Sequence, residues 1–125
     1  MGLDCADLES CYASFVDVEI DKLHLLALVG DDKQAVAEIL DDFLGGGLSL
    51  LDEMELALSK ADIDSFEGTL HQLKGASSMF GLKSVCQICV GLEAESFEGI
   101  EVSTLLELRD IFGKSYKLAK LLVVG

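Results

Sequence analysis

The sequence predicts an all-α fold, an antiparallel four-helix bundle with an additional short N-terminal helix. Half of the 125 residues are hydrophobic, which is enough for one core, and proline is absent. Apolar side chains recur at the three- and four-residue spacing of helices, in segments rich in leucine, alanine and valine. Short polar or glycine-containing stretches separate these segments. Short connections favour antiparallel packing of neighbouring helices.

The pattern divides the chain into six expected helices, over 5–15, 19–29, 31–60, 62–79, 83–97 and 103–122. Short polar side chains can cap a first turn, and acids favour its positive end, so the candidate starting residues are Asp17, Asp31, Asp32, Asp62 and Ser103. Gly30, Gly81 and Gly99 are the candidate stops. We expect a single domain over 1–125, with 1–16 as an extension or short helix and 17–122 as the bundle.

The expected helix over 31–60 contains three consecutive glycines, Gly45, Gly46 and Gly47. Three glycines cost about 3 kcal/mol of helix propensity relative to alanine. The apolar stripe nevertheless keeps its phase across them, through Val36, Leu40, Phe43, Gly47, Leu50, Met54 and Leu58. We therefore predict one helix that is kinked or locally loose at the glycines. The inner stripe of the next helix is predicted to be Ile63, Phe66, Leu70, Leu73, Ser77 and Phe80.

The charge of the chain limits its partners. With 23 acidic against 9 basic residues and a net charge of −14, it lacks the basic surface that nucleic-acid binding requires, and an anionic membrane surface would repel it. The late lysines, Lys114, Lys117 and Lys120, are interpreted as complementing the negative end of a C-terminal helix.

The N-terminus is acidic and shows no secretory signal, and no apolar run approaches 18 residues. We therefore expect a cytoplasmic protein with reduced cysteines. Cys86 and Cys89 have the C-x-x-C spacing, but a zinc site would need Cys5 and Cys11 to converge on them, and a thioredoxin-type site would need a strand before a helix. Small buried thiols at a helix interface are the favoured interpretation, and no metal site is expected.

The residues that carry chemistry lie between Thr69 and Gly81, in the sequence TLHQLKGASSMFG. Helical phase puts His71 outside the apolar stripe, so its side chain is expected to be substantially exposed. Gly68 and Gly75 lie about one turn before and after it and leave the surface around the ring clear. Lys74, also one turn away, can offer a cation to an anion held at the histidine.

Residues 71–82, HQLKGASSMFGL, resemble the motif of the histidine phosphotransfer (HPt) family, His-x-Leu-Lys-Gly-Ser/Ala-Ser/Ala followed by glycine and an apolar residue. The resemblance spans roughly residues 17–122 and is specific in the motif. It implies a four-helix bundle with the phosphorylated histidine exposed in mid-helix. It also implies a stoichiometric phosphocarrier rather than an enzyme, relaying a phosphoryl group between receiver-domain aspartates. The implied partners are response-regulator receiver domains, a hybrid sensor histidine kinase, or both.

The resemblance assigns phosphorylation to His71, and its motif includes Lys74 and Gly75, which are expected to support the phosphate or the partner. Gly68, by its position on the helix, and the polar side chains of Gln72 and Ser78 are further candidates for that support. Imidazole in water is mostly neutral near pH 7 and keeps a free lone pair for attack on phosphorus. Phosphoryl transfer needs mainly positioning and charge neutralisation, and the receiver is expected to bring Mg²⁺. No cofactor is expected on this chain, which carries no P-loop, and a monomer is expected. Glu67, one turn from His71, is interpreted as solvated or as a partner for a receiver cation.

Glu93 lies 22 residues beyond His71, the spacing at which chemotaxis-type kinases carry a glutamate that orients the phosphorylated ring. Those domains also have a histidine three residues earlier, where this chain has Val90. An orienting role for Glu93 is therefore a hypothesis, weighed against an ordinary solvated glutamate. Two alternative functions stay open: a chemotaxis-type phosphotransfer domain phosphorylated directly from ATP by a separate kinase domain, and a binding-only helical adaptor. His24 is interpreted as an ordinary surface or capping residue.

Overall fold

The computed structural model describes residues 18–30 and 32–124, which form helices and connecting turns without strands. The helices are α2 (Lys22–Val29), α3 (Lys33–Ser59), α4 (Ile63–Met79), α5 (Lys83–Ala94), the short 3-10 helix η1 (Phe97–Gly99) and α6 (Val102–Val124). The all-α prediction is confirmed. The helix expected over 5–15 and the cap expected at Asp17 lie outside the described residues.

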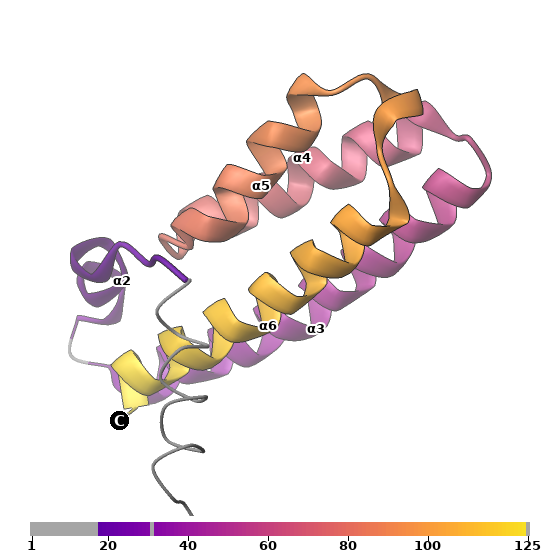
Figure 1. The fold of residues 1–125 in the computed structure, drawn as a ribbon. Coiled ribbons are helices and arrows are strands. Elements are labelled where there is room, and N and C mark those ends of the chain that lie inside the picture. Colours follow the sequence, from indigo (N-terminus) through magenta and orange to yellow (C-terminus); the bar gives the residue numbers. More distant parts are fainter. Residues whose placement is uncertain (1–17, 31, 125) are drawn as a thin grey trace, which may run out of the picture.

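Four long helices form the bundle (Figure 1). α3 packs against both α4 and α6, and α5 packs against the same two helices. Tight turns join α3 to α4 and α4 to α5, so these neighbours run antiparallel, and α6 returns beside α3 in the opposite direction. α2 lies across one end of the bundle and contacts α3 and α6. None of the described helices combines the length and apolarity needed to cross a membrane.

Aspartate side chains begin three of the helices. Asp21, Asp32 and Asp62 each accept a hydrogen bond from the backbone N–H three residues ahead, as N-caps do. α2 begins at Lys22, three residues later than predicted, because the preceding segment is extended. There the N–H of Asp21 donates to the carbonyl of Gly81 at 2.7 Å, and the N–H of Glu19 donates to Ser84 Oγ at 2.6 Å. This segment ties α2 to the α4–α5 turn.

The cap at Asp62 predicts how the stability of the folded protein depends on acid pH. Its carboxylate accepts hydrogen bonds from the hydroxyl and the N–H of Ser65, which hold the pKa of Asp62 below its usual value. A lowered folded-state pKa stabilises the protein above the unfolded-state value of about 3.9, and this stabilisation is lost as pH falls through the folded-state pKa. Asparagine also caps helices but cannot titrate. We expect the stability difference between wild type and Asp62→Asn to shrink from pH 7 to pH 2, measured by urea unfolding.

A matched control is Asp64→Asn, which removes a charge from the same first turn. Asp64 accepts no hydrogen bond from the described residues, so its replacement should change the acid sensitivity less. An equal loss of acid sensitivity in the two variants would contradict the role given to the cap.

α3 is one continuous helix through its three glycines, as the prediction of a single helix requires (Figure 1). The expected looseness is not seen, since the helix is assigned without interruption from Lys33 to Ser59. Packing explains why residue 47 is glycine, and helical phase alone does not indicate this. A β-carbon there would lie 2.1 Å from Cζ of Phe112 on α6, whereas one at Gly45 or Gly46 would meet nothing within 4 Å. The close approach of α3 and α6 therefore requires glycine at one of the three positions.

The core matches most of the predicted stripes, with shifts of one residue. On α3, Leu51 and Ala57 are buried in place of the predicted Leu50 and Leu58, which are partly buried against the core. On α4, Ile63 was predicted to face inward, but it is 40% exposed because it lies at the first position of the helix. Aromatic side chains form three ring contacts among the described residues: Phe43 packs at a tilt against Phe80 and against Phe112, and Phe66 meets Phe97 edge-on.

Two predicted boundaries near the C-terminal half are wrong. α5 ends at Ala94 instead of residue 97, because Glu95 is extended, and Phe97 belongs to η1. α6 begins at Val102, so Ser103 lies inside the first turn instead of capping it. The hydroxyl of Ser103 donates to the carboxylate of Glu101.

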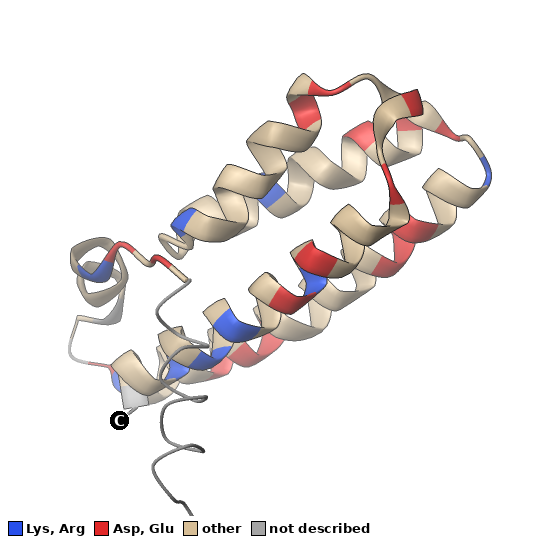
Figure 2. Cartoon of the chain, viewed as in Figure 1, with Lys and Arg blue, Asp and Glu red and all other residues tan. Residues whose placement is uncertain are grey.

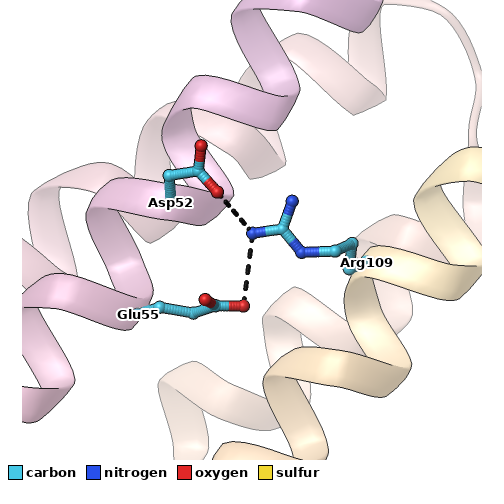
Figure 3. A network of polar contacts seen from close by, with 3 residues as sticks. All are labelled: Asp52, Glu55 and Arg109. Carbon is cyan, nitrogen blue, oxygen red and sulfur yellow. Dashed lines mark hydrogen bonds and ion pairs between the residues drawn. The ribbon is translucent and has the colours of Figure 1, made fainter.

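Ion pairs line the contact between α3 and α6. Figure 2 shows acidic positions on α3 and basic positions on the neighbouring α6. One Nη atom of Arg109 donates to Asp52 at 2.7 Å and to Glu55 at 3.2 Å (Figure 3). Lys120 and the Tyr116 hydroxyl both donate to Asp41. The late lysines therefore do not serve the helix end as predicted: Lys114 pairs with Asp110, Lys120 reaches α3, and no basic residue lies in the last turn.

Candidate functional site

His71 occupies the ninth position of the 17-residue helix α4, with its side chain exposed. The exposure follows from helical phase, because Leu70 and Leu73 on either side are at most 1% exposed and fix the inner face of the helix. The imidazole makes no hydrogen bond to any of the residues that the structure describes. Neither ring nitrogen is therefore occupied by a hydrogen bond within the described part of the chain.

Gly68 and Gly75 leave the surface beside His71 open. A β-carbon built at either position would have nothing within 4 Å of it. Neither glycine is therefore required by packing, in contrast to Gly47. Each is instead unfavourable by about 1 kcal/mol relative to alanine in a helix interior. Their effect is to remove side-chain bulk around the imidazole.

Lys74 and Glu93 form an ion pair between α4 and α5. Lys74 Nζ lies 2.7 Å from Glu93 Oε1, and both side chains are about one-third exposed. The hydrogen bond to Glu93 raises the pKa of Lys74. The carboxylate of Glu93 therefore contacts Lys74, and it makes no hydrogen bond to His71. Lys74 and Glu93 belong to different helices, and the fold brings their side chains into contact.

A hollow of about 330 Å³ lies beside His71, between α4 and the end of α5. Four of the residues that line it are buried and apolar, and we call these the floor: Phe66, Leu70, Leu92 and Ile100. Three exposed acidic residues line it beside His71, and we call these the rim: Glu67, Glu93 and Glu95. Sequence reasoning missed Glu95 and the floor, because the residues that follow Ala94 were predicted to be helical. Helical phase offered no indication that this segment folds back beside α4.

The other two polar candidates lie apart from that hollow. Gln72 is exposed and lines a second, shallower hollow between α3 and α4, together with Gly68. Ser78 is exposed near the end of α4 and lines neither hollow. Nε2 of His24 donates a hydrogen bond to the carbonyl of Met79 at 2.7 Å. That contact joins α2 to α4, consistent with an ordinary structural residue.

The chain matches the family model of the Hpt domain over residues 38–111, which is more than half of its length. The chain belongs to the Hpt domain family. The match includes all of α4 and α5 and most of α3. A search of curated proteins and a search of solved structures gave no significant match. Hpt domains carry out histidine phosphotransfer in phosphorelays, where they interact with receiver domains and histidine kinases.

The cysteines of this Hpt domain do not form a polar site. Cys86 is half-buried, with its Sγ 3.8 Å from the carbonyl of Lys74, and burial raises its pKa. Burial raises the pKa of Cys89 to about 12, so its thiolate is not populated at neutral pH. Within residues 18–30 and 32–124, no three His, Cys, Asp or Glu side chains are grouped as metal ligands. Cys5 and Cys11 fall outside the described residues.

Proposed function

We propose that this Hpt domain relays a phosphoryl group between receiver-domain aspartates through phosphorylated His71. The observation that carries the proposal is the exposed imidazole in mid-helix with open surface on both sides, at Gly68 and Gly75. A receiver domain must bring an aspartyl phosphate within bonding distance of the ring. Side chains at either glycine would stand in its way.

The chemistry requires little from the carrier itself. A ring nitrogen of His71 attacks phosphorus in line, the N–P bond forms, and the P–O bond to the aspartate breaks, with the electron pair leaving on the carboxylate. Transfer to the next receiver reverses these steps. The receiver supplies Mg²⁺ and the acidic pocket around its aspartate. This chain supplies the nucleophile, the Lys74 cation and a landing surface.

The proposal is tested by supplying two donors in parallel. One is a receiver domain labelled on its aspartate, and the other is ATP with a chemotaxis-type kinase domain. We expect label from the receiver, mapped to His71 by peptide mass spectrometry, and little from the kinase. Labelling only by ATP and kinase would favour the chemotaxis-type alternative. No labelling by either donor would favour a binding-only module.

The Lys74–Glu93 pair gives a prediction about the phosphorylated state. In the free protein Lys74 is held by Glu93, so binding of the phosphate by Lys74 must compete with this pair. Glu93→Gln should release the lysine and shift the equilibrium of transfer toward phosphorylated His71, by about two- to fivefold for an exposed pair. The measurement is the equilibrium ratio of labelled Hpt domain to labelled receiver.

The control is the same substitution in a Lys74→Gln background, where Glu93→Gln should have no further effect on the equilibrium. The hypothesis that Glu93 orients the ring makes the opposite prediction. In that case Glu93→Gln would slow transfer in both backgrounds.

A further inference from the structure

The hollow beside His71 combines an apolar floor with an acidic rim. Phe66 and Leu70 are 1% exposed and Leu92 is 4% exposed, so the floor is the outer surface of the core itself. The edge-on contact of Phe66 with Phe97, at 5.6 Å between ring centroids, places η1 as one wall. The volume of about 330 Å³ is at the lower end of the range for small-ligand pockets, enough for one long side chain.

Of the three acidic residues at the rim, only Glu93 has a cationic partner among the described residues. Glu93 is paired with Lys74, but Glu67 and Glu95 are exposed and form no ion pair with the described residues. The α3–α6 face differs, because Asp41, Asp52 and Glu55 all have cationic partners there. Figure 2 shows this contrast, with acidic segments around the end of α5 and η1 and mixed charges along α3 and α6.

We propose that this hollow receives a lysine or arginine side chain of the partner receiver domain. This inference rests on the proposed function and names how the partner is recognised. The alkyl stem of such a residue would cover the apolar floor, while its charged head would face the carboxylates of Glu67 and Glu95. A purely apolar side chain would fit the floor but would remove these carboxylates from water without a partner, which is unfavourable.

The position beside His71 gives the contact a role in the reaction. Phosphorylation adds negative charge about one turn from Glu67, and a partner cation in the hollow offsets that repulsion. While Lys74 pairs with Glu93, it cannot offset the negative charge of Glu67 and Glu95. The contact therefore favours binding of the receiver when the phosphoryl group is present.

The experiment compares two double variants that remove the same charge. Glu67→Gln with Glu95→Gln removes the uncompensated rim, and Glu38→Gln with Glu107→Gln removes two exposed acids that line neither hollow. Initial rates of transfer from a phosphorylated receiver are measured against Hpt concentration at low and high salt. We expect the rim variant to raise KM by about three- to tenfold, with kcat nearly unchanged and the salt dependence reduced.

Two outcomes would overturn the inference. Equal KM changes in both double variants would indicate long-range charge attraction only, and an unchanged KM in the rim variant would show that no cation binds there. In both cases wild-type His71 would still accept the phosphoryl group, so the proposed function would stand. Absence of label on wild-type His71 would instead reject the proposed function itself.

Discussion

Replacing His71 with glutamine should abolish phosphoryl transfer from a phosphorylated receiver. The glutamine amide nitrogen has its lone pair delocalised into the carbonyl group, so it cannot attack phosphorus as an imidazole nitrogen does. The fold should be unaffected, since the side chain is exposed and has no hydrogen bond to the described residues; surface changes of this kind stay within about 0.5 kcal/mol. The measurement is transfer of label from the receiver, with unfolding by urea recorded in parallel.

The chain offers a matched control, because it contains one other histidine. His24 is also exposed but bonds the carbonyl of Met79, and a glutamine amide can make a similar bond. His24→Gln should therefore transfer label at the wild-type rate. Full labelling of His71→Gln, or a loss of labelling in His24→Gln alone, would move the site away from α4.

The second large effect is expected at Gly47. An alanine there would place its β-carbon 2.1 Å from Cζ of Phe112, and the ring cannot easily withdraw because it also packs against Phe43. Overpacking of this kind destabilises a core by about 1–3 kcal/mol, which outweighs the gain of about 1 kcal/mol in helix propensity. Gly47→Ala should therefore lower the free energy of unfolding in urea.

Gly46→Ala is the control one residue earlier in the same helix. Its β-carbon would meet nothing within 4 Å, so this variant should be more stable than wild type by about 1 kcal/mol. Combining Gly47→Ala with Phe112→Leu should cost less than the sum of the two single changes, because the smaller side chain relieves the clash. If Gly47→Ala proved as stable as Gly46→Ala, the close α3–α6 contact would be wrong.

Local patterns in the sequence were sufficient for the fold. Apolar periodicity gave the four bundle helices, and the caps at Asp32 and Asp62 and the stops at Gly30 and Gly81 depend only on neighbouring residues. The errors arose where distant contacts decide. α2 starts late because the residues before it form hydrogen bonds with the α4–α5 turn, and Lys120 of α6 pairs with Asp41 on α3 instead of complementing its own helix end.

In the candidate site too, some features follow from the local sequence and others depend on contacts between helices. The exposure of His71 and the freedom around Gly68 and Gly75 follow from helical phase within α4, which the sequence displays directly. The Lys74–Glu93 pair and the hollow beside His71 require the register between α4 and α5, which no local pattern specifies. The phosphotransfer roles of all the candidate residues stay predictions: His71, Lys74, Gly68, Gly75, Gln72, Ser78 and Glu93.

The two glycines beside His71 affect how variants of this domain should be selected. Alanine at both positions would add about 2 kcal/mol of helix propensity without a clash, a large gain for a domain whose total stability is about 5–15 kcal/mol. A screen for heat resistance alone would therefore enrich alanine at both positions, while a screen for signalling would remove the bulkier residues. If the domain acts as proposed, thermal stability and partner access are opposed across these two turns of the helix, and selection for either property alone would give misleading results for the other.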